Sequence, residues 1–465
     1  MPEYLSLDAL GIPALSRLAS LTKQEIYLVG GFLRDRLLGK KRAVDVDLVI
    51  DGDPLPLLRE FGGNFIPLDP DFGIYRIFVG SLYFDVARMQ GENIFEDLLR
   101  RDFSINAMGA GPLSEQSFPI LDPAGGREDL EKKVIRAISR KNFRDDPLRL
   151  LRAFRFSANF GFEIEKNTLA WISALASRIG EVSFERISAE TFKLLASPSA
   201  DVLEEMGECG LLSALFPELS LLSELAPNEH HHLGALAHSI EAVRQLEGLL
   251  EHSDWLGPLK KDLFDYLDSS LAHERKVLPG LKFATLLHDV GKPSTFAFRE
   301  GRPRFIGHDK EGANIAKKIA LRLKLSVREV SFIETLVRHH MRPGLLATQG
   351  EASPKAIYRF FRDTKADGVA VLLLSLADRL SAQGPAVTPL DNEKNFSLVL
   401  RMLEDFFRAP EKVCPAPLLN GKEVMEILGI TSGPLVGKTL QELVEAQVQG
   451  LLKEKGEAIA WLQSK

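Results

Sequence analysis

The hydrophobic and polar positions along the chain change their period near residue 127. Before it, short apolar runs with alternating polar residues predict strands over 26–30, 44–50, 75–80 and 82–87. After it, apolar residues recur at spacings of three and four, which predicts helices over 146–160, 189–197 and 315–325. Proline and glycine near residues 227, 384 and 415 punctuate the helical part.

These patterns predict an α+β protein: an N-terminal head with a small mixed sheet, followed by helical regions. We expect a head over 1–126, a helical neck over 127–226, a histidine-rich helical domain over 227–385 and a C-terminal helical tail over 386–465. Cys209 and Cys414 lie too far apart to indicate a disulfide framework or a zinc cluster. With no leader peptide and no apolar run long enough to span a membrane, we expect a soluble cytoplasmic protein.

The charge is unevenly distributed. A net charge of -6 argues against a protein that coats nucleic acid indiscriminately. Residues 127–155, however, hold ten Lys or Arg against five Asp or Glu. This excess is typical of a local basic groove, although a solvated helix face would look similar.

Two acidic residues interrupt the second apolar run. Because a strand repeats every two residues, Asp45 and Asp47 share one face. Carboxylates held this close repel each other unless a cation lies between them. A solvated strand face would show the same alternation, but the apolar run 48–50 favours a strand covered on both sides. We therefore expect the pair to hold a cation.

The segment before these acids predicts an anion site. It reads as a strand, a Gly30–Gly31 turn and a short helix ended by Gly39. Glycines let the backbone approach an anion, the helix N-terminus directs free N–H groups at it, and Arg34 on the first turn adds charge. With a third strand acid, Asp85, these are the groups that two-metal phosphoryl or nucleotidyl transfer requires.

In this order the motifs resemble the nucleotidyltransferase superfamily typified by DNA polymerase beta. Within it they resemble the class II tRNA nucleotidyltransferases and bacterial poly(A) polymerases. The likeness spans residues 24–216 and includes the segments RRDFSINAM (100–108), ILDPAGGREDLEKKVIRAI (120–138) and ERISAE (185–190). It implies a polymerase-beta-like head, Mg2+ at Asp45 and Asp47, and ribose recognition by Arg101, Asp102 and Asn106.

The neck predicts how nucleobases are chosen. Arg149, Arg152 and Arg155 recur every three residues and form a positive stripe opposite an apolar face. Cytosine and adenine both offer an amino donor beside a ring-nitrogen acceptor, which a carboxylate and a guanidinium can meet. Asp146 and Arg149 can therefore accept CTP and ATP, as the family's Glu-Asp-x-x-Arg motif implies, although the first acid here is Asp145. Asp146 also fits a helix N-cap, and Arg152 or Arg155 would meet the triphosphate.

All ten histidines lie between His230 and His340. Imidazole and carboxylate ligands from separate helices suit a divalent transition metal, which would activate water against a phosphate ester. The order H…HD…D resembles the HD-domain phosphohydrolases, in the residues His238, His288, Asp289 and Asp378. A second ion could be held by His308, His339 and His340, whereas the three histidines at 230–232 fit a polar loop.

The sequence thus predicts an enzyme that adds CMP and AMP, or AMP alone, to the 3′ end of tRNA, with ATP and CTP as substrates and an HD phosphohydrolase domain. A bacterial poly(A) polymerase is the alternative within this class. An HD phosphohydrolase whose head only grips RNA is the alternative from another class, and the intact Asp45, Asp47 and Asp85 argue against it. A module that only binds tRNA would need neither set of ligands. No oligomeric state is predicted.

Overall fold

The computed structural model describes residues 3–40, 45–80, 82–115, 117–223, 225, 234–299, 302–348, 351–382, 384 and 388–464. Two compact units divide the chain: Met1–Ser183 with Cys209–Leu211, and Phe184–Glu208 with Leu212–Lys465. The histidine run 230–232 and the domain boundaries predicted near 227 and 385 lie outside the described residues.

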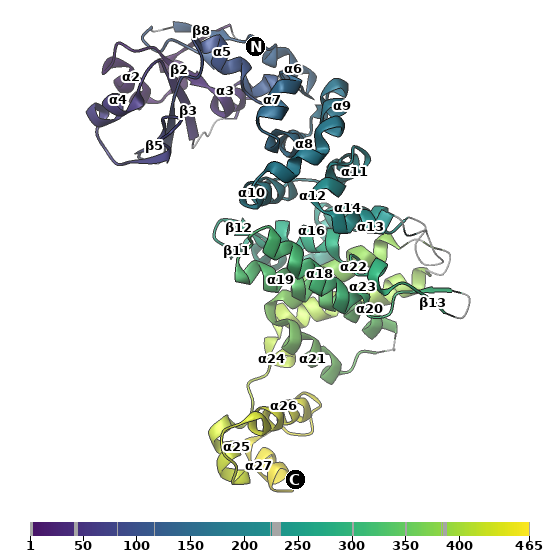
Figure 1. Ribbon diagram of the computed structural model, residues 1–465. Coiled ribbons are helices and arrows are strands. Elements are labelled where there is room, and N and C mark those ends of the chain that lie inside the picture. The colour runs from purple at the N-terminus through teal and green to yellow at the C-terminus, as the bar shows by residue number, and fades with distance from the viewer. Residues whose placement is uncertain are drawn as a thin grey trace. The chain divides into compact units, whose positions relative to one another are not determined.

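A mixed sheet forms the centre of the first unit (Figure 1). The described strands are β1 (Tyr4–Ser6), β2 (Ile26–Val29), β3 (Asp45–Ile50), β4 (Phe65–Asp69), β5 (Ile74–Val79), β6 (Leu82–Arg88), β7 (Gly109–Ala110) and β8 (Ser117–Leu121). They pair in the order β1-β8-β7-β2-β3-β6-β5-β4. Only β3 and β6 pair in parallel among them. Leu48, Val49 and Ile50 of β3 are buried, as expected for a covered strand.

Helices flank this sheet and continue into the neck. The described ones are α1 (Leu7–Leu10), α2 (Pro13–Ser20), α3 (Gly30–Leu37), α4 (Pro54–Phe61), α5 (Ile94–Leu99), α6 (Gly126–Lys132), α7 (Arg140–Asp145), α8 (Leu148–Phe160) and α9 (Lys166–Leu175). A short 3-10 turn, η1 (Ser104–Asn106), lies between α5 and β7. The neck is not wholly helical, because β9 (Val134–Ile135) and β10 (Glu163–Ile164) pair in parallel.

The second unit is mainly helical. It begins with α10 (Phe184–Leu195), α11 (Ala200–Glu208), α12 (Leu211–Leu215) and α13 (Pro217–Ser223). A bundle follows, made of α14 (Ala235–Glu251), α15 (Lys260–Asp268), α16 (Val277–Leu287), α17 (Lys292–Thr295), α18 (His308–Arg322), α19 (Val327–His339), α20 (Met341–Thr348), α21 (Pro354–Thr364), α22 (Gly368–Ser381), α23 (Pro389–Arg408) and α24 (Pro410–Val413). Fully buried Val243, Phe283, Leu336 and Leu373 fill its interior. The short strands β11 (Ser270–Ala272) with β12 (Arg275–Lys276), and β13 (Ala297–Arg299) with β14 (Arg302–Arg304), form two antiparallel pairs.

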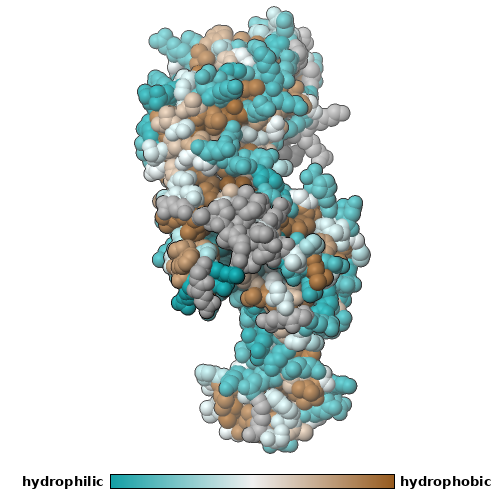
Figure 2. Space-filling model, turned by 90° about the vertical axis from the view of Figure 1, so that its right-hand side faces the viewer, coloured by the Kyte–Doolittle hydropathy of each residue, from teal (hydrophilic) through white to brown (hydrophobic). Residues whose placement is uncertain are grey.

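The C-terminal helices have a hydrophobic core of their own. They are α25 (Gly421–Leu428), α26 (Pro434–Val448) and α27 (Lys455–Gln463), and Val424, Leu443 and Leu462 meet between them. None of the described helices is long and apolar enough to cross a membrane. On the face of the molecule in Figure 2, hydrophilic residues are interspersed with smaller hydrophobic patches.

Candidate active sites

The acidic pair lies on the central strand of the head. In the parallel register of β3 and β6, Asp45 is opposite Tyr83 and Asp47 is opposite Asp85. Asp45, Asp47 and Asp85 therefore share one face of the sheet, as the two-residue period predicts. A hydrogen bond to Asp45, followed by burial, raises the pKa of Tyr83 to about 12, which keeps this phenol neutral beside the acids.

Asp47 lies directly against the Gly30–Gly31 turn. The Gly31 N–H donates to Asp47 Oδ2 at 3.1 Å. Gly30 has a φ of +69°, and a Cβ there would lie 3.0 Å from Arg101 Nη1 and 3.1 Å from Asp47 Oδ2, so this position favours glycine. Burial and then the Asp85 charge raise the pKa of Asp47, whereas Arg101 lowers it. A cation beside this carboxylate would offset both the cost of burying its charge and the repulsion from Asp85.

Asp85 is already paired with a basic side chain. Arg76 of β5 donates from Nε and Nη2 to its two oxygens, each at 2.7 Å. The described residues of the head hold no group of three metal-type ligands with all atoms within 4.8 Å. Asp45 and Asp47 fit a magnesium ion by ligand type, because Mg2+ prefers one or two carboxylates together with phosphate oxygens.

Arg34 does not lie where the sequence predicted it. It falls in the last turn of α3, not the first, and is only 8% exposed. Its Nη1 donates to Asn106 Oδ1 at 2.6 Å, and its guanidinium lies 4.6 Å from the ring centre of Phe160 on α8. The first turn of α3 is occupied by residues 30–33, so the fifth helical residue turns inward against the neck.

A buried chain of polar contacts continues from Asn106. The Asn106 amide donates to Asp102 Oδ1 at 2.9 Å, and Arg152 donates to Asp102 Oδ2 from Nε at 2.8 Å. Burial alone would raise the pKa of Asp102, but the Arg152 charge and the Asn106 hydrogen bond lower it to about 2. The expected ribose residues and the neck stripe thus meet in one network, with Arg152 held by Asp102.

Asp146 follows the end of α7, and Arg149 lies on the first turn of α8. Asp146 Oδ1 accepts a hydrogen bond from the Leu148 N–H at 3.2 Å, but the N-cap of α8 is Pro147. Asp146 Oδ2 lies 4.0 Å from Arg149 Nε. Arg149 also donates from Nη1 to the carbonyl of Arg100 at 2.9 Å, beyond the end of α5, and burial lowers its pKa. The prediction that Asp146 is the N-cap of this helix is therefore wrong, because Pro147 takes that place, whereas the base-reading role of the pair stays a prediction.

The third arginine of the stripe stacks on an aromatic ring. The Arg155 guanidinium lies 3.8 Å from the ring centre of Phe156, and Arg152 lies 5.2 Å from the same centre. Arg101, beside Asp47, donates to Asp97 Oδ2 at 3.1 Å. The candidate site residues of the head and neck, from Gly30 to Arg155, belong to one compact unit, whereas the segment ERISAE (185–190) falls in the second.

The second unit gathers a cluster of metal-type ligands. Its described residues include two groups whose ligand atoms lie within 4.8 Å of one another: His238, His288 and Asp378, and Asp289, His308 and His340. Asp289 connects them, because Oδ2 lies 3.3 Å from His288 Nε2 and Oδ1 lies 3.5 Å from His308 Nε2. His339 belongs to neither group; it faces Arg342, and burial followed by that charge lowers its pKa.

Hydrogen bonds orient the imidazoles of this cluster. Nδ1 of His288, His308 and His340 lies 2.7–2.8 Å from the carbonyls of Thr285, Phe305 and Val337. These contacts place a proton on each Nδ1 and turn Nε2 toward the cluster, the arrangement of metal-ligating histidines. Within the described part of the chain, the fully buried Nε2 of His288 makes no hydrogen bond. The donor set fits a divalent transition metal.

The pKa shifts within the cluster also favour a bound cation. Burial alone would lower the pKa of His288, but the Asp289 and Asp378 carboxylates raise it to about 10. Burial, and then the neighbouring His288 and His308, lower the pKa of His340 to about 4. Two desolvated carboxylates thus demand positive charge between them, which a divalent ion supplies.

A small cavity reaches the cluster. It has a volume of about 190 Å³ and is lined by His340 and Asp378 together with Arg379, Lys394 and Asn395. The Asn395 Oδ1 is buried and makes no hydrogen bond with any described residue. Cationic and amide groups beside metal ligands are suited to a phosphate ester.

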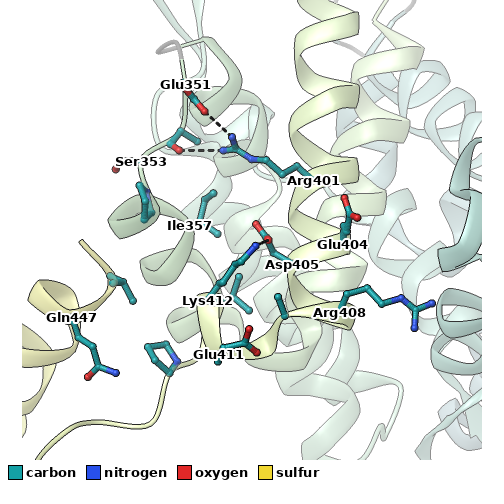
Figure 3. A pocket seen from close by; sticks show the side chains of 16 residues that line it. Glu351, Ser353, Ile357, Arg401, Glu404, Asp405, Arg408, Glu411, Lys412 and Gln447 are labelled. Carbon is teal, nitrogen blue, oxygen red and sulfur yellow. Dashed lines mark hydrogen bonds and ion pairs between the residues drawn. The ribbon is translucent and has the colours of Figure 1, made fainter. Parts of the chain in front are cut away.

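A larger hollow elsewhere in this unit has a different character. It measures about 930 Å³ and lies between α21, α23, α24 and α26 (Figure 3). Its charges are paired with each other: Arg401 with Glu351 at 3.1 Å, and Lys412 with Asp405 at 3.3 Å. Arg408 points away from it and binds Asp262 at 2.5 Å. These internal pairs give no reason to assign it a charged ligand.

The chain matches several known families. The "Poly A polymerase head domain" matches residues 26–95 and 85–136, the "Probable RNA and SrmB- binding site of polymerase A" matches 161–222, and the "HD domain" matches 236–383. An "A-adding tRNA nucleotidyltransferase" of Deinococcus radiodurans is 35% identical over 448 residues, which cover 94% of each chain. A "CC-adding tRNA nucleotidyltransferase" of Thermus thermophilus is 33% identical, over 95% of this chain and 94% of the relative. The chain belongs to the tRNA nucleotidyltransferase family.

Solved structures support the fold of this tRNA nucleotidyltransferase. A Thermotoga maritima CCA-adding enzyme complexed with tRNA matches with a TM-score of 0.64 and 19% identity, over 100% of this chain and 99% of the other. A CCA-adding enzyme in complex with ATP matches with a TM-score of 0.66 and 20% identity, over 100% and 98%. The expected head fold, the α+β class and the enzymatic nature of the chain are thereby confirmed.

Sequence reasoning missed several residues of these sites. Arg76, Tyr83 and Asn142 were not singled out, and each contacts an expected residue or its backbone; Asn142 donates to the carbonyl of Arg101 at 2.7 Å. Lys292 lies 2.5 Å from Asp289 Oδ2. Its place at the end of the segment HDVGK, one helical turn after Asp289, was the signal that could have found it.

Proposed function

We propose that this tRNA nucleotidyltransferase adds CMP or AMP to the 3′ end of tRNA, using CTP and ATP. The observation that carries the proposal is the face of β3, which carries Asp45 and Asp47 and where Asp47 lies against the glycine turn of α3. Mg2+ held by these two acids would activate the attacking hydroxyl and neutralise the triphosphate. The relatives named for adding A or CC support this class of substrate.

The other residues of the unit take complementary roles. Asp146 and Arg149 meet the cytosine or adenine edge, and Arg101, Asp102 and Asn106 recognise the ribose. Gly30, Gly31 and Arg155 face the triphosphate. Arg152 holds Asp102 in place, because its Nε and Nη2 already point at that carboxylate. Asp85 is the third acid, and Arg76 sets its charge.

Incorporation assays test the head. The protein is incubated with labelled CTP or ATP and one of three RNAs: tRNA that ends before CCA, tRNA that ends in CC, and an unrelated oligonucleotide. We expect incorporation into at least one of the two tRNAs and little into the oligonucleotide. The tRNA that is extended and the nucleotide that is incorporated together distinguish the addition of CC, of A alone and of the whole CCA end. Efficient extension of the oligonucleotide with ATP alone would indicate poly(A) synthesis instead.

Paired variants test the metal assignment. Asp45→Asn with Asp47→Asn should abolish incorporation, because a magnesium site without its carboxylates loses its ligands. Asp51→Asn is the matched control, since this exposed acid follows the same strand. Normal incorporation by the double variant would contradict the metal assignment.

We further propose that the second unit hydrolyses phosphate esters. A divalent transition metal held by His238, His288, Asp289 and Asp378 would supply an activated water, and Asp289, His308 and His340 can hold a second ion. His288→Ala with Asp289→Ala should lower both the bound metal, measured by mass spectrometry, and the hydrolysis of p-nitrophenyl phosphate with added Mn2+. His252→Ala is the control, because this exposed histidine belongs to neither group. Unchanged metal content in the double variant would refute the site.

A further inference from the structure

An unusual hairpin extends from the histidine-rich bundle. Strands β13 and β14 form it, and Figure 1 shows it at the edge of the bundle. Its large apolar side chains face solvent: Phe296 is 51% exposed, Phe298 69% and Ile306 74%. Arg299 and Arg304 are exposed on the same two strands. Exposed apolar groups gathered in one small element indicate a binding surface.

The composition of this hairpin favours nucleic acid. Residues 296–306 contain three arginines and one glutamate, in a chain whose net charge is -6. Arginines bind phosphates, and exposed aromatic rings provide faces on which unpaired bases stack. A double helix would hide those bases, so the matching partner is a single strand.

Side-chain contacts connect the hairpin to the metal-type cluster. Lys292 Nζ lies 2.5 Å from Asp289 and 5.7 Å from the ring centre of Phe305. The rings of Phe305 and Phe296 lie 5.8 Å apart, and the carbonyl of Phe305 contacts His308 Nδ1 at 2.8 Å. The C-terminal end of the hairpin is therefore fixed to the cluster through His308, and its N-terminal end packs on that same end through Phe296.

A glycine makes this connection tight. A Cβ on Gly291 would lie 2.3 Å from the carbonyl oxygen of His308 and 2.4 Å from the Gly312 nitrogen. Only a glycine lets the segment that carries Asp289 approach the start of α18 so closely. The hairpin thus leaves from one side of a rigid junction and returns to the other.

The cavity at the cluster is too small for a polynucleotide. Its volume of about 190 Å³ lies below the roughly 300–1,000 Å³ of ordinary small-molecule pockets. It can take a phosphate ester, while the rest of a nucleic-acid substrate must bind outside it. The hairpin is a surface fixed to the cluster that has the chemistry to do so.

We infer that the β13–β14 hairpin binds the single-stranded end of an RNA and presents its terminal phosphate ester to the HD cluster. This rests on the proposed phosphohydrolase function. In the reaction, water adds to phosphorus, the bond from phosphorus to the ribose oxygen breaks, and that oxygen takes a proton. The products are inorganic phosphate and an RNA with a free hydroxyl.

Hydrolysis of two substrates tests the inference. One is a short unstructured oligoribonucleotide with a terminal phosphate, and the other is p-nitrophenyl phosphate, which lacks bases. Phe298→Ala with Arg304→Ala should lower kcat/KM for the oligoribonucleotide about tenfold or more, mainly through KM, since stacking and phosphate contacts act in binding. Its kcat/KM for p-nitrophenyl phosphate should stay within about twofold. Leu321→Ala with Lys318→Ala, exposed residues on α18, is the matched control and should change neither.

Crosslinking gives a readout that does not need catalysis. An oligoribonucleotide containing 4-thiouridine is irradiated with the full-length protein, and crosslinked peptides are identified by mass spectrometry. We expect crosslinks within residues 296–299 or 302–304, lost in the hairpin variant and kept in the control. Absence of crosslinks there, or equal losses on both substrates, would overturn the inference. Crosslinks without any hydrolysis by the wild-type protein would instead refute the phosphohydrolase proposal.

Discussion

The ion pair between Asp102 and Arg152 gives the most quantitative prediction. The pKa of Asp102 falls from 3.8 to about 2 in the folded chain, and one pKa unit is worth about 1.4 kcal/mol. The native pairing of this carboxylate thus stabilises the first unit by about 2 kcal/mol at neutral pH. Arg152→Met leaves the charge of Asp102 buried with the Phe103 N–H, the Asn106 amide and the weaker influence of the Arg149 charge, and should cost about 3 kcal/mol.

The pH dependence of that variant has a definite sign. In the wild type, the folded pKa of Asp102 is below its unfolded value, so its contribution is present above pH 3.8 and is lost as the pH falls toward 2. Without Arg152, burial dominates and raises the folded pKa. Stability contributed by the protonated carboxyl is then lost as the pH rises. Asp102→Asn in the same background should remove this dependence.

Tryptophan fluorescence can isolate the unit concerned. Trp171 lies on α9 of the first unit, whereas Trp255 and Trp461 lie in the second. With Trp255→Phe and Trp461→Phe in every protein, urea unfolding followed by fluorescence reports on Trp171 alone. Four proteins form a double-mutant cycle: the parent, Arg152→Met, Asp102→Asn and the combination.

The cycle can refute the reasoning. We expect the combined variant to be more stable than the sum of the single effects predicts, by about 2 kcal/mol, because the second change removes the stranded charge. Effects that add within about 0.5 kcal/mol would show that the two side chains do not stabilise each other. A loss of stability on acidification in Arg152→Met, as in the parent, would contradict the assigned direction of the pKa change.

Three further predictions address other parts of the molecule. Arg34→Met should weaken the preference for ATP over dATP with little change of kcat for ATP, while Arg34→Lys keeps part of it, because Arg34 positions the Asn106 amide; equal losses for both nucleotides would favour a phosphate contact instead. Asp146→Ala should cost about 1 kcal/mol through the lost hydrogen bond from the Leu148 N–H and also admit GTP and UTP; a change of stability alone would leave Asp146 only this local structural role. Removing metal with a chelator should lower the melting temperature of the second unit, and Mn2+ should restore it, since an ion bound only by the folded state stabilises that state; an unchanged melting temperature would contradict the metal site.

Local patterns predicted those features that depend on neighbours in sequence. The period of two placed Asp45 and Asp47 on one face, and the apolar run after them indicated a covered strand, as the sheet shows. The resemblance of His238, the His288–Asp289 pair and Asp378 to the HD-domain phosphohydrolases predicted residues that come together from three separate parts of the bundle. Their metal and catalytic roles stay predictions.

Features that depend on how helices and strands pack against each other could not be predicted from the sequence. The inward direction of Arg34 follows from the docking of α3 against Phe160, and the Arg76–Asp85 pair follows from the register of β5 with β6. The two histidines at the end of α19 show the same limit. Consecutive helical residues point about 100° apart, so His340 reaches the cluster and His339 faces away from it.

The two sites are alike in their electrostatics. In the head, Asp85 lies opposite Asp47 on the neighbouring strand, and both of its oxygens accept hydrogen bonds from Arg76. Less of the negative charge of Asp85 therefore acts on a cation at Asp45 and Asp47. In the cluster of the second unit, Lys292 stands in the same relation to Asp289. Each lysine or arginine offsets one carboxylate within a group of several, and this limits the repulsion that burial would otherwise strengthen. Enough negative charge is left for a divalent ion. Arg76 and Lys292 therefore reduce the repulsion between the carboxylates of each site before any ion or substrate binds. They also determine how strongly the remaining carboxylates attract a cation.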